Sequence, residues 1–375
     1  EIDLDPEAAA ALVDAKLVTT SRVAGRVGRW RLKAAGKVGS VAVTVPDGRI
    51  IRVRITPKTP VARLLFLLGY SLGAKGWRDD DVGLAEEAGL VPIVAWFFQQ
   101  QAERALRGGP LRGYRSTAET LPVLRGRLRE ADQVRIHHDR AIPAEVVHDE
   151  YTVDIAENRL LRAACERLCR LPDDIPGGVP DQVRTGLLRL RLRLADVTPI
   201  SPGGALPPWR PDRLNAHYHN ALRLAELILR DACAEHRPGE VAVTGFLLDM
   251  PGVFERFVTV ALRDALAGRG GWCALQAKLF LDEHHAIRMR PDLVRYADNG
   301  RPIAVVDAKY KVERPKGYPD ADLYQILAYC VALSLPEGHL VYAKGNAAPT
   351  EHQVRHAGVV IHQHALDLSQ PPAGL

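Results

Sequence analysis

The chain has 375 residues, of which 47% are apolar and 25% are charged; this is the usage of ordinary globular proteins and excludes a disordered or fibrous chain. Its length exceeds what one hydrophobic core usually organises, so we expect two domains. The 50 basic and 45 acidic residues give a net charge of +5, which permits a polyanionic partner without requiring one, and no apolar run approaches the roughly eighteen residues that a membrane-spanning helix needs.

The first part of the chain predicts a small α+β module. Two β-rich segments, residues 41–45 and 50–55, flank the turn tripeptide Pro-Asp-Gly at residues 46–48 and predict a hairpin. An apolar segment follows, and a helical pattern then runs over residues 84–106 until a Gly-Gly-Pro sequence ends it.

The middle of the chain predicts helices and then a linker. A helical pattern spans residues 154–171. Residues 188–194 alternate Leu and Arg, which fits a strand, but both residue types are good helix formers and we favour a helix. The Pro- and Gly-rich stretch 199–208 cannot continue a helix or a strand. We therefore place the main domain boundary there, between residues 1–200 and residues 201–375.

The last part of the chain predicts an α/β domain. Helical patterns cover residues 214–236, 253–267 and 322–333, with β segments between the last two. The expected fold class is therefore an α+β N-terminal region, β-rich at its start and helical at its end, followed by an α/β domain.

The chemistry-bearing residues gather in two predicted strands joined by an Asn-Gly turn at residues 299–300. Alternate side chains of a strand share one face, so Asp307 and Lys309 project together at the end of the second strand. The hairpin can bring Asp292 back beside them. Two carboxylates and one amine are therefore expected to converge.

This set of side chains suits phosphodiester hydrolysis, which needs a hard cation bound by oxygen ligands and a group that orients or activates the attacking water. We expect Asp292 and Asp307 to bind Mg²⁺, with Mn²⁺ as an expected substitute, and the backbone carbonyl of Ala308 to complete the ligand set. Lys309 is expected to position or deprotonate the water and to offset charge in the transition state.

Two helical residues complete the predicted site. Glu255 lies on an amphipathic helix before the hairpin and is expected to join the metal shell directly or through water, and Gln325 lies on the helix after it and is expected to orient the site. Both also fit solvent-facing helix positions. The Asp and Lys of the hairpin could equally form a solvated surface salt bridge, although a buried pair without a task is costly.

The order Glu, Pro-Asp, Asp-x-Lys, Gln resembles the PD-(D/E)xK nuclease superfamily, and the flanking sequence resembles one branch of it. That branch is the McrC family, the endonuclease subunit of McrBC-type modification-dependent (5-methylcytosine) restriction systems. Blocks that carry the resemblance lie at residues 114–127, 154–161, 218–229, 246–258, 290–292, 307–311 and 322–329. The resemblance implies a PD-(D/E)xK restriction-endonuclease-like domain in residues 201–375.

The resemblance also implies a partner, a hexameric McrB-like AAA+ GTPase that recognises double-stranded DNA carrying modified cytosine. The N-terminal region would dock in the pore of the ring and stimulate GTP hydrolysis, and the chain would be a Mg-dependent type IV restriction endodeoxyribonuclease subunit. The sequence contains no Gly-x-x-x-x-Gly-Lys-Ser/Thr loop, so GTP is used by the partner and not by this chain. Arg125 and Arg127 are candidates for the partner contact, with a plain surface or packing role open for each.

Two other functions stay open at this point. The chain could be a free-standing PD-(D/E)xK nuclease in repair or mobile-element defence, or a non-catalytic DNA-binding adaptor. Five scattered cysteines and an acidic start unlike a signal peptide predict a cytoplasmic protein without membrane contact. Four histidines near the C-terminus bracket an apolar strand and lack a matching acid, so we expect no metal centre there. These are His352, His356, His362 and His364.

Overall fold

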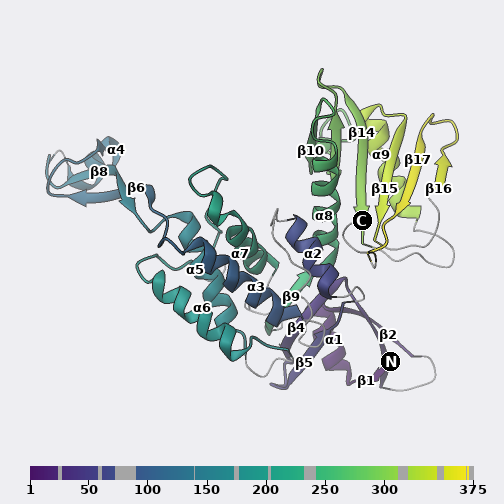
Figure 1. Ribbon diagram of the computed structural model, residues 1–375, viewed down its shortest axis with the longest axis horizontal. Helices are drawn as coiled ribbons and strands as arrows, with labels where there is room; N and C mark the ends of the chain where they lie inside the picture. The colour runs from purple at the N-terminus through teal and green to yellow at the C-terminus, as the bar shows by residue number, and fades with distance from the viewer. Residues whose placement is uncertain are drawn as a thin grey trace. The chain divides into compact units, whose positions relative to one another are not determined.

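A computed structural model describes most of the chain in two compact units. The described residues are 1–23, 28–57, 61–71, 90–138, 140–172, 177–201, 204–231, 242–310, 320–343, 350–368 and 370. The first unit comprises residues 1–90 and 247–375, and the second comprises residues 91–246 (Figure 1). The boundary predicted near residue 200 therefore lies inside the second unit, and the division of roles between residues 1–200 and 201–375 stays a prediction.

The N-terminal part of the first unit is rich in β-structure, as the sequence predicts. Its elements are β1 (Ile2–Asp3), α1 (Pro6–Asp14), β2 (Val18–Arg22), β3 (Arg29–Ala34), β4 (Lys37–Thr44), β5 (Ile50–Ile55) and α2 (Val61–Ser71). The predicted hairpin is confirmed, because β4 and β5 pair antiparallel with Val41 opposite Val53. Helix α1 begins where the Asp5 side chain accepts a hydrogen bond of 2.8 Å from the Ala8 N–H, a common way to satisfy a free helical donor.

The C-terminal part of the first unit is a sheet with helices packed on it. Its elements are β9 (Ala242–Asp249), which crosses the division at residue 246, α8 (Met250–Ala265), β10 (Trp272–Leu275), β11 (Leu279–Phe280), β12 (Arg288–Met289), β13 (Leu293–Tyr296), β14 (Pro302–Lys309), α9 (Asp320–Leu333), β15 (Glu337–Tyr342), β16 (Thr350–Gln353) and β17 (Val360–Ala365). Six described strands form one sheet in the order β10-β13-β14-β15-β17-β16. Helix α8 packs on β14, and α9 packs on β14, β15 and β17.

Strand direction in this sheet changes at β14. The strand pairs antiparallel with β13, as predicted for the hairpin, and parallel with β15. A parallel neighbour needs a crossover connection, which α9 supplies. Helix α8 begins at Met250, three residues before the predicted start, because the Asp249 side chain caps it through a 3.2 Å hydrogen bond from the Gly252 N–H.

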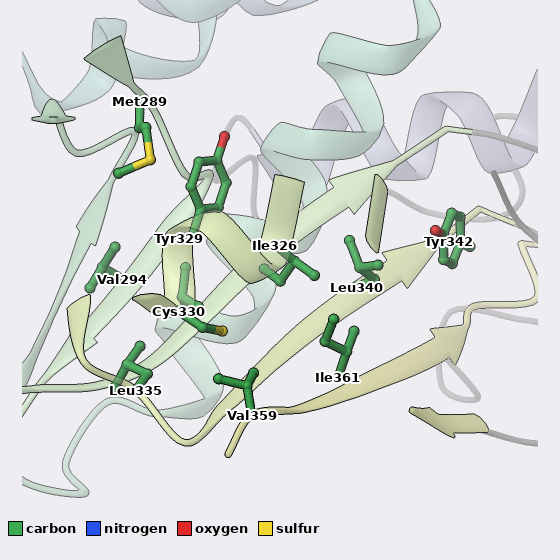
Figure 2. Packing of buried hydrophobic residues seen from close by; sticks show 11 residues of the cluster. Met289, Val294, Ile326, Tyr329, Cys330, Leu335, Leu340, Tyr342, Val359 and Ile361 are labelled. Carbon is green, nitrogen blue, oxygen red and sulfur yellow. The ribbon is translucent and has the colours of Figure 1, made fainter. Parts of the chain in front are cut away.

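The core between α9 and the sheet fixes the position of the helix that follows β14. Figure 2 shows Ile326, Tyr329 and Cys330 of α9 among apolar side chains of the strands. Helix and strand approach closely at Gly338, where a Cβ atom would lie 2.5 Å from Cys330 Sγ and 2.8 Å from Ile326 Cγ1. Any larger residue at this position would have to displace the Cys330 and Ile326 side chains of α9.

The second unit is mainly helical, with a small sheet. Its elements are α3 (Leu90–Ala105), β6 (Gly113–Leu121), β7 (Arg127–Leu128), α4 (Glu130–His137), β8 (Ala144–Thr152), α5 (Ala156–Cys169), α6 (Asp181–Arg193), the 3₁₀ turn η2 (Ala216–Tyr218) and α7 (His219–Asp231). Helix α5 packs on α6 and α7. The helices predicted over 154–171 and 188–194 are therefore confirmed, while residues 84–89 and 232–236 of two further predicted helices lie outside the described residues.

The sheet of the second unit has the order β6-β8-β7 and stands out from the helices of that unit together with α4 (Figure 1). Residues 114–127 of this projecting sheet carry part of the family resemblance, but their residue pattern did not predict its strands. The structure as a whole is a mixed α/β fold, which confirms the predicted α+β character. In the described part of the chain, no helix has the length and apolar character to span a bilayer.

Candidate functional site

Asp292 and Asp307 face each other at the ends of two neighbouring strands. Asp292 directly precedes β13, and Asp307 lies near the end of β14. Because Leu293 pairs with Val306, the next position along the ladder sets the two aspartates opposite each other, where side chains share one face. Both are buried, with 8% and 2% of their surface exposed. The Asp292 carboxylate also accepts a 2.7 Å hydrogen bond from the Ala308 N–H.

Lys309 completes this convergence. It lies two positions after Asp307 on β14, so both side chains project from the same face, and its ammonium forms an ion pair with Asp307 Oδ2. Apart from this ion pair, Oδ2 is a buried oxygen with no hydrogen-bond donor among the described residues. Two facing carboxylates and one amine therefore meet at the end of the strand.

Glu255 of α8 joins the two aspartates from the helix that packs on β14. Its half-buried carboxyl group lies within hydrogen-bonding reach of Asp292. On its other side it accepts a hydrogen bond from the Gln276 side-chain amide, whose oxygen in turn accepts from Arg290. We call Asp292, Asp307 and Glu255 the carboxylate site. Sequence reasoning did not single out Gln276, which lies in a connection with no pattern to mark it.

Burial and mutual repulsion change the protonation of the carboxylate site. Burial raises the pKa of Asp292 to about 8, with a further contribution from the charge of Asp307. Burial also raises the pKa of Asp307, although the Lys309 ammonium opposes the shift. For Lys309 burial acts to lower the pKa, but the attraction of Asp307 outweighs it and the pKa is raised. Lys309 is therefore an ammonium group near neutral pH.

The backbone of Ala308 lies beside the same carboxylates. Its N–H points to Asp292, and in an extended strand the N–H and C=O of one residue point to the same side. The Ala308 carbonyl is therefore directed toward the side on which Asp292 lies, and its role as a ligand stays a prediction.

Gln325 is a predicted site residue whose hydrogen bond goes to Tyr329 and not to the aspartates or Lys309. Its side chain is exposed on α9, and its amide donates a 2.7 Å hydrogen bond to the Tyr329 hydroxyl one turn later. Burial raises the pKa of Tyr329, and the negative charge of Asp307 raises it further. The phenol thus lies in the field of the carboxylate site, and Gln325 reaches the site through it.

Asp322 is a second residue that sequence reasoning did not assign to the site. It is 3% exposed and accepts a 3.3 Å hydrogen bond from the Tyr342 hydroxyl. Its charge contributes to the raised pKa values of Asp307 and Lys309. An acid in the first turn of a helix is usually explained by the helix dipole, which is why its position gave no separate signal.

The donor set fits a hard cation. It consists of carboxylate oxygens and a backbone carbonyl, which Mg²⁺ and Mn²⁺ prefer over nitrogen and sulfur. Among the described residues the buried Asp307 Oδ2 has the Lys309 ammonium as its partner and accepts no other hydrogen bond, so it has a further lone pair that such an ion would satisfy. No three His, Cys, Asp or Glu side chains in the described ranges form a ready-made metal centre, so the carbonyl and water would have to complete the ligand shell.

Three of the C-terminal histidines, His352, His362 and His364, lie in strands and His356 lies in a turn, and one expectation about them was wrong. His362 does have acidic neighbours, because its ring nitrogens lie 3.5 Å from Glu337 and 3.2 Å from Glu351. The ring of His352 instead lies 3.3 Å from the Gln363 side-chain oxygen.

Arg125 and Arg127, the predicted partner contacts, lie in the second unit at the end of its projecting sheet. Arg127 begins β7, and both residues are exposed. Gly126 between them has a φ of +81°, and a Cβ there would meet the Val147 carbonyl oxygen. The backbone turn between the two arginines therefore depends on glycine.

Comparisons with known proteins address the fold and the family. The family model of the McrBC 5-methylcytosine restriction system component matches residues 32–343. A chain in the refined half-complex from the tetradecameric assembly of Thermococcus gammatolerans McrB AAA+ hexamers with bound McrC is 19% identical, with a TM-score of 0.51 over 96% of this chain and 84% of that one. A chain in the cryo-EM structure of the Thermococcus gammatolerans McrBC complex is 22% identical, with a TM-score of 0.38 over 64% of this chain and 69% of that one. The search of curated proteins found no match. The first of the two structures shares the fold.

Proposed function

Because this chain belongs to the family of McrBC 5-methylcytosine restriction system components, we propose that it is the DNA endonuclease subunit of a GTP-dependent, modification-dependent restriction complex. The nuclease is of the PD-(D/E)xK type and hydrolyses phosphodiesters with Mg²⁺. The observation that carries this proposal is the convergence of Asp292, Asp307 and Lys309, which are buried or half-buried at the end of one sheet.

The residues of the carboxylate site divide the chemistry between them. Asp292, Asp307 and the Ala308 carbonyl hold Mg²⁺, and Glu255 holds it directly or through water. The ion, when bound, supplies positive charge at the phosphodiester and a more acidic water. Lys309 would position the attacking water or take up the proton that it loses, and in its ammonium form it would offset charge that develops in the transition state.

The helix after β14 supports this arrangement. Gln325 holds the Tyr329 hydroxyl, and Tyr329 packs in the core that fixes α9 against the strands (Figure 2). Gln325 therefore orients the site through the phenol and the helix. Asp322 adds a further negative charge near Lys309, which favours the charged form of the amine.

The partner in this proposal is a hexameric McrB-like AAA+ GTPase, which uses the GTP and recognises DNA carrying modified cytosine. The projecting sheet of the second unit is suited to contact it. Val123 and Leu124 are 69% and 62% exposed at its end, and the exposed Arg125 and Arg127 follow them directly. Exposed apolar side chains next to arginines are typical of protein interfaces.

A cleavage assay tests the proposal. Methylated and unmethylated plasmids are incubated with the chain, with and without the cognate GTPase, GTP and Mg²⁺. We expect cutting of the methylated plasmid only when all components are present, and none with Asp307→Ala, which should still bind the GTPase and stimulate GTP hydrolysis. Normal cutting by Asp307→Ala would refute the assignment. Cutting without GTP or partner would favour a free-standing nuclease, and metal-independent DNA binding without nicking would favour an adaptor.

A further inference from the structure

Gln276 occupies a constrained position beside the carboxylate site. It directly follows β10 and has a φ of +48°, a region that non-glycine residues seldom adopt. Its backbone N–H donates a 2.9 Å hydrogen bond to the Asp292 carbonyl. The backbone at Asp292, directly before β13, therefore holds Gln276 next to this aspartate, and the Gln276 side chain contacts Glu255.

The orientation of the Gln276 amide is determined by its two neighbours. An arginine side chain can only donate hydrogen bonds and a carboxylate can only accept them. Arg290 donates to the Gln276 oxygen, and the Gln276 nitrogen donates to Glu255. The two contacts agree on one orientation of the amide, and both ends of it are satisfied.

The result is a chain of three side chains that ends at a cation ligand. Arg290 holds Gln276, Gln276 holds one oxygen of Glu255, and the carboxyl group of Glu255 reaches Asp292. A neutral amide transmits orientation without carrying charge. An arginine paired directly with Glu255 would instead neutralise the carboxylate that a divalent cation needs.

Asp154 in the second unit shows the opposite arrangement within the same chain. Its carboxylate is contacted directly by Arg115 and Arg159, the latter through 2.7 Å hydrogen bonds. That carboxylate is buried and compensated by arginine. At Glu255 the arginine is kept one side chain away.

We infer that Gln276 is a positioning residue of the nuclease site: it orients the Glu255 carboxylate toward the bound cation and separates that carboxylate from the Arg290 guanidinium. This inference rests on the proposed function, because it assigns a role toward the same cation. Residues that orient metal ligands typically change metal affinity about 10- to 100-fold when they are replaced.

The first test measures Mg²⁺ affinity on the full chain, from the melting temperature as a function of Mg²⁺ concentration. Gln276→Leu removes both hydrogen bonds at nearly constant size, and we expect Mg²⁺ binding at least tenfold weaker than in the parent. Gln353→Leu, an exposed glutamine of β16 in the same sheet, is the matched control and should titrate like the parent. A Gln276→Leu protein that titrates like the parent would overturn the inference alone. If the parent shows no Mg²⁺ stabilisation that Asp307→Ala abolishes, the proposed function fails and the inference fails with it.

The second test exchanges the acid and the amide. The double variant Gln276→Glu with Glu255→Gln keeps an acceptor for Arg290 and a hydrogen bond between residues 255 and 276. It places the negative charge at position 276, next to the Arg290 guanidinium, instead of at position 255, next to Asp292. We expect the melting temperature of the double variant without metal to equal that of the parent, because both hydrogen bonds are kept, while its Mg²⁺ binding is at least tenfold weaker than that of the parent. Recovery of both would show that the hydrogen bonds have only a structural role and would overturn the inference.

Discussion

Replacing Asp292 by asparagine should stabilise the metal-free protein, and increasingly so as the pH rises. The side chain is 8% exposed, and its pKa in the folded protein is about 8 against an ordinary value of 3.8. The folded state therefore holds a proton that the unfolded state loses. As the pH rises from about 3.8 to about 8, the free energy of unfolding of the parent falls, and above pH 8 it changes little. Asparagine cannot ionise, so this loss is absent in the variant, and its side-chain oxygen can still accept the Ala308 N–H.

The size of the effect follows from the same two values. At about 1.4 kcal/mol for each pKa unit, the difference between 3.8 and about 8 gives an upper limit of about 6 kcal/mol, half of which is reached near pH 6. For a unit of this size, about 1 kcal/mol changes the melting temperature by about 2 to 4 °C. The advantage of Asp292→Asn should therefore grow by about 3 to 5 °C for each pH unit from pH 4 to pH 8.

The assay is thermal unfolding of both proteins in EDTA across this pH range. Asp264→Asn removes an exposed carboxylate of the same unit and gives the background for loss of one charge. A difference between parent and Asp292→Asn that stays constant from pH 4 to pH 8 would refute the reasoning. Addition of Mg²⁺ at pH 8 should stabilise the parent and not the variant, so the gap between them should narrow.

Three further predictions concern other parts of the chain. Hydrogen bonds from Arg159 and Thr198 hold the pKa of Asp154 well below its usual range, so its contribution to the free energy of unfolding is complete above about pH 4 and is lost below it. Asp154→Asn should therefore lower the free energy of unfolding by about 3 kcal/mol at pH 7 and by progressively less below pH 4, as measured by denaturant titration. Gly338→Ala should cost about 1 to 3 kcal/mol of unfolding free energy through overpacking against α9, and a simultaneous Cys330→Ala should restore part of it. Replacement of both Arg125 and Arg127 by alanine should lower stimulation of the partner's GTP hydrolysis at least tenfold, while the Mg²⁺ affinity measured by thermal shift should equal that of the parent.

Local patterns were sufficient for most elements and for the centre of the site. Alternation along a strand has a period of two, so Asp307 and Lys309 had to share a face wherever that strand lay, and the Asn-Gly turn fixed the return of Asp292. The helices over residues 154–171 and 188–194 followed from residue type and apolar spacing. Helix ends were less well predicted, as at α8, because a single side chain such as Asp249 decides where a helix begins.

Composition also located the Pro- and Gly-rich stretch near residue 200, but not the compact units. A linker signal reports only that the local chain forms no helix or strand, whereas a unit is defined by contacts between distant segments. Residues 1–90 join residues 247–375, and no property of either segment alone indicates this.

The sequence by itself therefore determined which residues are candidates for the chemistry and which of them share a strand face, since these depend on neighbours along the chain. Only the tertiary structure decided the protonation of the carboxylate site and the hydrogen bonds that hold its side chains. The raised pKa of Asp292 arises from burial beside Asp307 and Glu255, and the side-chain hydrogen bonds of Gln276 join Glu255 of α8 to Arg290, which directly follows β12. Burial and charge act through space with strengths that depend on distance and exposure, and neither quantity exists until the chain has folded.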